Sequence, residues 1–152
     1  MIVAAALAAA ATAAGPRQAA PVSGSDLITG RTVGLAAYEG RPVVINAWAS
    51  WCGGCIVEAK DLRTFARSHP DVALLGIDTE DSRTSARAFY RAHGFTWPSI
   101  FDPKGRVARK LGVKGLPTTL FLDRRHRIVF AIAGAGSLKR FNDGLTRALS
   151  GG

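Results

Sequence analysis

The stretch Trp51-Cys52-Gly53-Gly54-Cys55 holds both cysteines of this 152-residue chain. It follows the apolar, β-branched run at 43–48 and opens a segment with helical periodicity, so we expect it at a strand-to-helix junction. In that position the first thiol lies at a helix N-terminus, whose free N–H groups and dipole stabilise a thiolate. The second thiol lies one turn further on, within reach of a disulfide with the first.

This arrangement of two cysteines predicts a thiol–disulfide exchange centre. The thiolate is the attacking species in such exchange, so Cys52 would be the nucleophile and Cys55 would resolve the mixed disulfide by attacking Cys52. A metal site would need about four ligands, and the chain offers two cysteines and three histidines that are distant from them in sequence. A structural cross-link here would close a very small loop and add little stability. We therefore expect redox chemistry, with no metal and no cofactor beyond the redox-active disulfide.

The composition is that of a globular protein with a basic surface. The chain is 47% hydrophobic and 20% charged, with a formal net charge of +9 at pH 7. A domain of this size can bury enough apolar surface to fold without disulfide staples. The charge could favour an acidic partner, anionic lipid or nucleic acid, but the basic residues are scattered and do not alternate with aromatic residues. We interpret them as a solvated surface and expect no nucleic-acid partner.

The first residues differ in composition from the rest of the chain. Residues 1–14 are uncharged, apolar and shorter than the roughly 20 residues that span a bilayer. They resemble the core of a secretory signal with an A-x-A-like cleavage site at 11–13, although no Lys or Arg precedes the run. A membrane-anchor remnant and an alanine-rich helix are the alternatives. Residues 15–24 have the composition of a linker. We expect a folded domain at 25–152, in an oxidising, extracytoplasmic compartment.

Hydrophobic periodicity predicts alternating strands and helices beyond residue 41, and a short strand or hairpin around 32–34. The first long helix should stop before Pro70. We expect strands at 43–48, 72–77, 98–101, 118–122 and 128–133, and helices at 52–68, 82–93, 106–111 and 137–149. This βαβαβ order, followed by an antiparallel pair and a helix, predicts an α/β fold whose sheet is mostly parallel and has helices on both faces. The chemistry should lie at the carboxyl end of a central strand.

Two further features bear on the chemistry. Glu58 lies three residues after Cys55, so both side chains project from the same helix face. A carboxylate partly buried beneath the sulfurs has a raised pKa and can exchange protons with a thiol near neutral pH. A Glu that stabilises the helix dipole is the alternative, and the spacing does not decide between them. Pro117, just before a predicted strand, is compatible with a cis bond in a tight loop, although most X–Pro bonds are trans.

Together these residues resemble the thioredoxin-fold proteins of the exported thiol–disulfide oxidoreductase group that includes TlpA, ResA and the DsbE-like reductants of cytochrome c maturation. The resemblance covers roughly residues 25–150 and implies a central mixed sheet. The helix and strand at about 82–101 resemble the insertion that separates this group from minimal thioredoxins. The matching residues are the run from Asn46 to Cys55, Glu58, Gly112-Val113, the run from Gly115 to Thr119, and Leu122-Asp123.

The resemblance implies roles for these residues. It implies Cys52 as nucleophile, Glu58 as a proton-handling residue, and a cis Leu116–Pro117 bond packed against the disulfide. It places the substrate beside Trp51, Leu116 and Pro117. It also implies a protein substrate that bears a disulfide or dithiol, and a membrane thiol carrier as electron donor.

Three positions depart from the pattern of the group. Gly54 stands where a proline is common, which changes the first helical turn and leaves the redox potential open. Asn46 stands where cytosolic thioredoxins carry a buried aspartate, so proton handling cannot come from that position. His126 stands in the hairpin turn where the group usually has glycine, so we expect it at positive φ.

The sequence therefore predicts a monomeric, exported thiol–disulfide oxidoreductase that reduces disulfides of extracytoplasmic proteins such as apocytochrome c. The main alternative has the same fold and the opposite direction, the oxidation of secreted protein thiols. Another is a non-catalytic module that uses the same loop to hold a protein or a metal ion. A peroxidase is less favoured, because nothing near Cys52 indicates a peroxide pocket.

Overall fold

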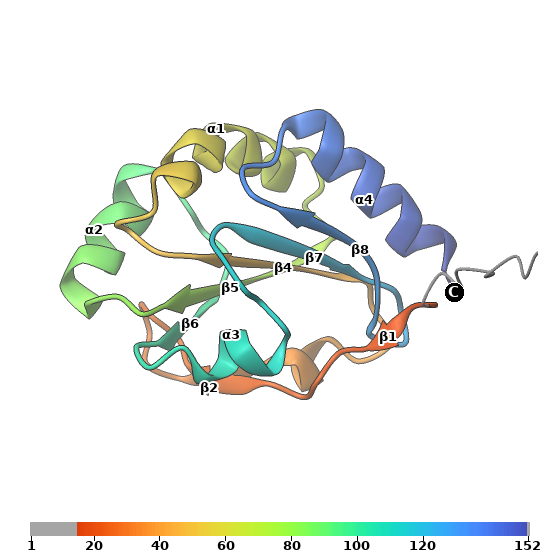
Figure 1. Ribbon diagram of the computed structural model, residues 1–152, viewed down its shortest axis with the longest axis horizontal. Coiled ribbons are helices and arrows are strands. Elements are labelled where there is room, and N and C mark those ends of the chain that lie inside the picture. The colour runs from red at the N-terminus through yellow and green to blue at the C-terminus, as the bar shows by residue number, and fades with distance from the viewer. Residues whose placement is uncertain (1–14, 152) are drawn as a thin grey trace, which may run out of the picture.

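The computed structural model describes residues 15–151, which form a central sheet covered on both faces (Figure 1). The signal-like segment predicted at 1–14 lies outside the described residues. The strands are β1 (Arg17–Gln18), β2 (Ser23–Ser25), β3 (Thr32–Gly34), β4 (Val43–Trp48), β5 (Ala73–Thr79), β6 (Ser99–Asp102), β7 (Thr118–Leu122) and β8 (Arg127–Ala133). The helices are α1 (Gly53–Ser68), α2 (Arg83–Ala92), α3 (Arg106–Lys110) and α4 (Leu138–Ser150), with a 3-10 turn, η1, at Leu35–Tyr38.

The sheet is mixed and has the strand order β1-β8-β7-β4-β5-β6. Strands β4, β5 and β6 run parallel to one another, whereas β7 pairs antiparallel with β4, and β8 pairs antiparallel with both β7 and β1. The expectation of a mostly parallel sheet was wrong in this respect. The C-terminal hairpin adds to the sheet beside β4, and β1 then extends the sheet beyond the hairpin. The mixed sheet that the resemblance implied is confirmed.

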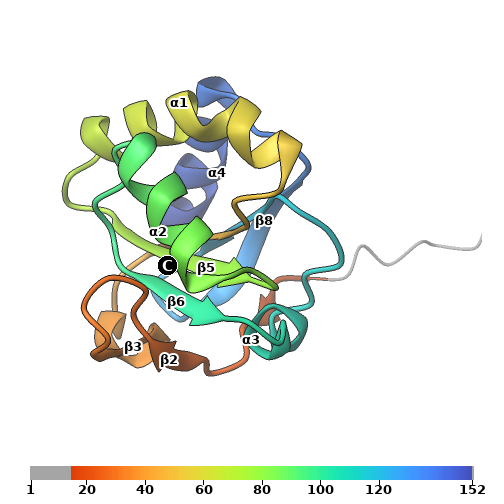
Figure 2. The same ribbon diagram turned by 90° about the vertical axis from the view of Figure 1, so that its left-hand side faces the viewer.

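Strand β4 lies at the centre of the sheet because it is apolar on both faces, as a strand covered from both sides must be. Val44 and Trp48 contact the core beneath α1, α2 and α4, while Val43, Ile45 and Ala47 contact the core on the side of α3 and η1. Figures 1 and 2 show α1 and α4 together on one face of the sheet, with α3 and the β2–β3 hairpin on the other. This central strand ends immediately before the cysteine loop.

The N-terminal part of the described chain belongs to the folded unit. Residues 15–24, expected to be a linker, contain β1, which pairs with β8, and the start of β2, which pairs with β3. Ala19 and Val22 in this segment are buried. Its small and polar residues are typical of linkers, but strands as short as these are specified by the edges they meet rather than by their own propensity.

The elements predicted between residues 43 and 149 are present, with ends that shift by one or two residues. The inserted helix and strand are α2 and β6. His126 has a φ of 57°, as expected from its place in the β7–β8 turn. Within residues 15–151, no helix has both the length and the apolar character needed to cross a bilayer.

Candidate active site

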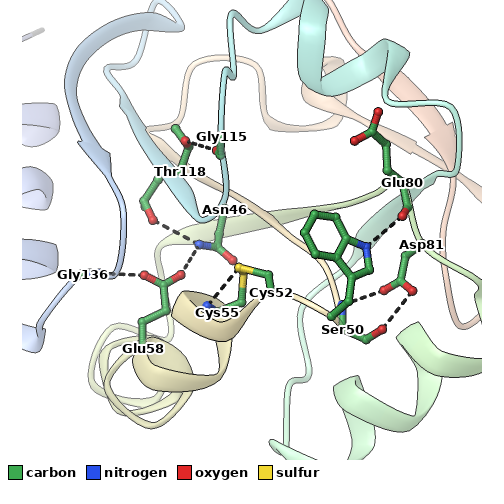
Figure 3. The surroundings of a disulfide bond; sticks show 12 residues. Asn46, Ser50, Cys52, Cys55, Glu58, Glu80, Asp81, Gly115, Thr118 and Gly136 are labelled. Atoms are coloured by element: carbon green, nitrogen blue, oxygen red, sulfur yellow. Dashed lines mark hydrogen bonds between the residues drawn. A yellow bond between two sulfur atoms is a disulfide. The ribbon is translucent and has the colours of Figure 1, made fainter.

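The two cysteines lie where β4 gives way to α1, at the carboxyl end of the central strand (Figure 3). Cys52 is the N-cap residue of the 16-residue helix α1, and its Sγ accepts a hydrogen bond of 3.1 Å from the backbone N–H of Cys55. A disulfide joins Cys52 to Cys55, with their Cα atoms 5.2 Å apart. The sulfur of Cys52 thus takes the place of the oxygen that usually caps a helix, where it meets the positive end of the helix dipole.

The two cysteines of the disulfide are buried, whereas the tryptophan that precedes them is exposed. Cys52 and Cys55 are 5% and 3% exposed, and both belong to the core beneath α1. Trp51, just before them, is 60% exposed. Its indole Nε1 donates a hydrogen bond of 2.9 Å to the carbonyl oxygen of Glu80, in the loop that follows β5. This bond fixes the position of the ring. An exposed aromatic ring fixed beside a disulfide is a surface on which a partner can dock.

Glu58 lies one turn of α1 after Cys55 and is 1% exposed. Each of its carboxylate oxygens has a donor: Asn46 Nδ2 donates to Oε1 at 2.9 Å, and the backbone N–H of Gly136 donates to Oε2 at 2.8 Å. Asn46 Nδ2 also donates to Thr119 Oγ1 at 3.1 Å. The carboxylate is therefore held by groups from β4 and from the loop before α4 (Figure 3).

Burial raises the pKa of Glu58 above its ordinary value, against the opposing effect of the hydrogen bonds from Gly136 and Asn46. A buried carboxyl with a raised pKa is suited to accept and return a proton closer to neutral pH than a solvated one. The expectation that this carboxylate is buried is therefore confirmed by its position. Asn46 does not titrate, but it orients the group that does.

The loop that contains Leu116 and Pro117 reaches the helix end that carries the cysteines. The bond between Leu116 and Pro117 is cis. A Cβ added at Gly54 would lie 2.8 Å from Pro117 Cδ, so the absence of a side chain at Gly54 permits this close approach. The carbonyl of Pro117 accepts a hydrogen bond of 2.9 Å from the N–H of Gly134, which ties the loop to the end of β8.

Two hollows flank the segment 114–116 on the surface. One, of about 510 Å³, extends from Trp51 to Leu116 and includes Arg109 in its wall. The other, of about 360 Å³, lies over the β7–β8 side of the same loop. The side chains predicted to bind substrate, Trp51 and Leu116, therefore share one hollow, and Leu116 also lines the second.

Several residues of the site were missed at the level of the sequence. Thr119 and Gly136 hold Asn46 and Glu58 in place but belong to segments far from the cysteines. Asp81 accepts hydrogen bonds from Ser50, which precedes the cysteines by two residues. Asn46 was noted in the sequence, but its hydrogen bond to Glu58 was not predicted. No local signal marks the others, because their contacts are long-range.

Within residues 15–151, no group of three or more His, Cys, Asp or Glu side chains is arranged to hold a metal ion. The candidate site thus consists of the disulfide, the buried carboxyl of Glu58 and the open surface around Trp51 and Leu116. This arrangement can perform thiol–disulfide exchange, because it offers a sulfur at a helix N-terminus, a second sulfur to resolve the intermediate, and a proton acceptor.

Known proteins resemble this chain over the same region. The model of the AhpC/TSA family matches residues 16–131. The thiol:disulfide interchange protein DsbE of Pasteurella multocida is 31% identical over 111 residues, which cover 72% of this chain and 60% of that protein. The DsbE protein of Tatumella citrea is 32% identical over 100 residues, 65% of this chain and 53% of that protein. The chain thus spans between half and two thirds of the length of these curated relatives.

Solved structures of proteins with similar names superpose on this chain. A DsbF homologue from Corynebacterium diphtheriae superposes with a TM-score of 0.78 at 30% identity, covering 85% of each chain. A secreted thiol-disulfide isomerase from Corynebacterium glutamicum superposes with a TM-score of 0.76 at 32% identity, covering 88% of this chain and 84% of that one. The fold is thioredoxin-like, as the family resemblance implied. Because the family model matches well over half of the residues, the chain belongs to the AhpC/TSA family and has homologues among the DsbE-, ResA- and DsbF-like proteins.

Proposed function

We propose that this protein is an exported thiol–disulfide oxidoreductase that exchanges electrons through Cys52 and Cys55 and reduces disulfides in extracytoplasmic proteins such as apocytochrome c. The observation that carries the proposal is the disulfide at the N-cap of α1, beside the exposed ring of Trp51. The names of the relatives support the reaction class, since they are thiol:disulfide interchange proteins and a secreted thiol-disulfide isomerase. The role in cytochrome c maturation comes from the resemblance of the motifs.

The proposed reaction transfers two electrons in two exchanges. The Cys52 thiolate of the reduced protein attacks one sulfur of the substrate disulfide, forming a mixed disulfide and releasing one substrate thiolate. Cys55 then loses its proton and attacks Cys52 Sγ, which releases the second substrate thiolate and leaves the Cys52–Cys55 disulfide. A membrane thiol carrier restores the dithiol by the same steps in reverse and is itself oxidised. The helix N-terminus favours the first step because it stabilises the Cys52 thiolate.

In this proposal, Glu58 accepts the proton of Cys55. Its position one turn along α1 puts it on the same helix face as Cys55, and its raised pKa lowers the cost of holding the proton at neutral pH. The hydrogen bonds from Asn46 and Gly136 fix the carboxyl in one orientation. The alternative role, a charge that stabilises the helix dipole, does not require a buried and fully bonded carboxyl.

Substrate binding is assigned to the surface around Trp51, Leu116 and Pro117. The hollow there is lined by Arg109 and Lys114 as well as by Glu80. Arg109 and Glu80 face each other at 3.9 Å with both side chains more than half exposed, so their attraction is weak and either can turn towards a partner.

The equilibrium reduction potential and a substrate assay test this function. We expect a potential more negative than about −200 mV, close to or below that of glutathione-like poise. The reduced protein should reduce a peptide whose Cys-x-x-Cys-His segment, the pattern of c-type haem attachment, has been oxidised to a disulfide. The Cys52→Ser variant should lose all exchange, and Cys55→Ser should accumulate a mixed disulfide with the peptide.

The other outcomes of these experiments would each indicate one of the alternative functions. A potential near about −120 mV, as in strong oxidants, would reverse the proposed direction and identify an oxidant of secreted thiols. If Cys52→Ser still bound the peptide, and the wild-type protein failed to exchange with it, the protein would be a binding module. A variant with Glu39→Gln, at an exposed position away from the site, serves as the matched control.

A further inference from the structure

A basic surface adjoins the candidate active site, and the proposed reaction does not use it. Residues 103–117 join β6 to β7 and include α3, and they contain five basic residues and no acidic residue. The basic residues of the whole chain are scattered, but in this segment no acid offsets them. All five are exposed and form what we call the α3 face: Lys104, Arg106, Arg109, Lys110 and Lys114.

Two of these cations line the hollow beside the disulfide. Arg109 and Lys114 share the hollow of about 510 Å³ with Trp51 and Leu116. Lys114 also lines the neighbouring hollow of about 360 Å³. It precedes Leu116 by two residues, and two residues of extended chain span at most about 7 Å. A group that contacts Lys114 would therefore belong to a part of the substrate only a few residues away from a cysteine that approaches beside Leu116.

The positive charge of the α3 face is almost uncompensated. Within residues 15–151, Arg109 is the one member of this face whose side chain lies within 4.0 Å of an acidic oxygen. Lys139 on α4, by contrast, has Asp143 at 2.7 Å. A set of exposed cations without acidic partners, next to a hollow, favours the approach of a negatively charged ligand.

Glu80 shows how a carboxylate can meet this face. Its Oε1 lies 3.9 Å from Arg109 Nη1, and the two side chains are 60% and 61% exposed. The backbone of Glu80 is held at a φ of 53°, with its N–H donating to the carbonyl oxygen of Asp102 at 3.0 Å and its own carbonyl accepting from Trp51 (Figure 3). An exposed pair at this separation is weak, so a carboxylate from a partner can replace that of Glu80.

We propose that the α3 face docks an acidic segment of the protein substrate, with Asp or Glu residues close to the substrate cysteine contacting Lys114 and Arg109. This inference rests on the proposed function, because it names the class of protein that the same site takes. Complementary charge of this kind raises the rate of encounter and fixes the orientation of the partner. A peptide suits the position better than a membrane does, because a flat array of headgroups does not enter a hollow.

Exchange with two matched peptides tests the proposal. Both carry one oxidised Cys-x-x-Cys segment, which is flanked by Glu residues in one peptide and by Gln residues in the other. We expect the reduced wild-type protein to react about threefold to tenfold faster with the Glu peptide at low ionic strength, and this ratio to fall towards one in high salt. Reduction of both peptides by a small neutral thiol corrects for any effect of Glu on the peptide disulfide itself. Equal corrected rates would overturn the proposal and leave the oxidoreductase intact.

Charge variants separate the α3 face from the net charge of the protein. Arg109→Gln combined with Lys114→Gln should lower the Glu-to-Gln rate ratio at least about twofold. Arg91→Gln combined with Arg140→Gln is the matched control, because it removes the same charge from exposed positions on α2 and α4, which pack against the core opposite α3. It should keep the wild-type ratio. Glu80→Gln should raise the ratio, since it removes a competing carboxylate. An equal loss in both double variants would contradict a local docking surface.

A binding measurement does not depend on exchange. The Glu peptide with both cysteines replaced by Ser is titrated at millimolar concentration into the oxidised protein, and the backbone amides are followed by NMR. We expect shifts at residues 104–116 that the Gln peptide does not cause. If these shifts were present while no peptide exchanged, acidic docking would be supported and the oxidoreductase refuted. If they were absent, the docking surface would be refuted.

Vesicles of phosphatidylglycerol test the competing ligand class. We expect the wild-type protein and the Arg109→Gln, Lys114→Gln double variant to sediment with them to the same extent, because the whole surface is basic. Binding that this double variant loses, together with equal exchange rates for the two peptides, would assign the α3 face to a membrane surface and overturn the proposal.

Discussion

Replacement of Glu58 by Gln removes the proposed proton acceptor with little change in shape. Glu58 Oε1 accepts from Asn46 at 2.9 Å and Oε2 accepts from Gly136 at 2.8 Å. Glutamine keeps one acceptor oxygen and presents an NH₂ group in place of the other, so one of the two donors loses its partner. We expect Glu58→Gln to fold and to lose the proton transfer specifically.

The size of both effects follows from these contacts. One unpartnered buried donor costs about 1–3 kcal/mol of folding free energy, which is less than the roughly 5–15 kcal/mol that stabilise a typical domain. A positioned general base contributes about 100-fold to 10,000-fold to a rate. Because water and hydroxide also take protons from a thiol, we expect the low end of that range, a slowing of about 100-fold in the attack by Cys55.

Stopped-flow reaction of the reduced protein with dithiobis(nitrobenzoate) separates the two exchanges. Attack by Cys52 releases the first coloured thiolate, and attack by Cys55 on the resulting mixed disulfide releases the second. We expect Glu58→Gln to leave the first phase unchanged, because the helix N-terminus, not Glu58, stabilises the Cys52 thiolate. The second phase should slow.

The pH dependence gives the sign of the effect. In the wild type, the second phase should accelerate as Glu58 loses its proton, which happens at a higher pH than for an ordinary Glu because burial raises the pKa above 4.5. In Glu58→Gln, this acceleration should be absent from the pH range in which Glu58 ionises. Equal second phases in the two proteins at every pH, with Glu39→Gln as control, would refute the role of Glu58.

Three further predictions concern stability. In Asp78→Asn the free energy of unfolding should rise at pH 7 by at most about 4 kcal/mol, because the wild type loses stability as pH increases from the ordinary pKa of 3.8 towards about 8; chemical denaturation at several pH values checks this, and an unchanged pH profile would contradict it. Gly54→Ala should cost about 1–3 kcal/mol, since its Cβ would lie 2.8 Å from Pro117 Cδ; a thermal melt as stable as the wild type would show that the first turn of α1 and the Pro117 loop separate freely. Asp123→Ala should destabilise the β7–β8 turn, because buried Asp123 accepts three hydrogen bonds from Arg125 and Arg127. Burial opposes ionisation, but these bonds outweigh it and lower the pKa of Asp123, so the wild-type advantage in chemical denaturation should be present above about pH 4 and vanish as the pH falls through the lower folded-state pKa.

The central part of the fold was predictable because its signals are local. The run at 43–48 is apolar at each position except Asn46, Pro70 limits α1, and the β7–β8 hairpin has apolar strands around a polar turn. Strands β1 and β2 carry no such signal. Arg17–Gln18 is a polar pair that becomes a strand because the edge of β8 offers unpaired backbone groups, and its Arg17 Nη2 reaches the carbonyl oxygen of Leu111 at 2.5 Å. This information lies in the assembled sheet rather than in the segment.

The candidate site also has one part that local spacing predicts and another part that depends on the assembled fold. Cys52, Cys55 and Glu58 share one helix, so their spacing in the sequence is enough to indicate a common face. The partners of Glu58 lie 12 and 78 residues away in the chain, and their contact depends on how β4 and the loop before α4 are placed. Asp78 ends an apolar run, and a polar residue in a buried strand is a signal that could have been noticed.

The two buried acids Glu58 and Asp78 differ in one respect that decides what each can do. Glu58 has a donor on each oxygen, so its charged form is supported and it can alternate between proton states while its position is fixed. Asp78 has no donor within the described residues and burial raises its pKa to about 8, so its neutral form is the supported one. A group that changes its proton easily is suited to exchange with Cys55. A group that keeps its proton at neutral pH is not suited to that exchange, so the two environments give the two buried acids different proton chemistry.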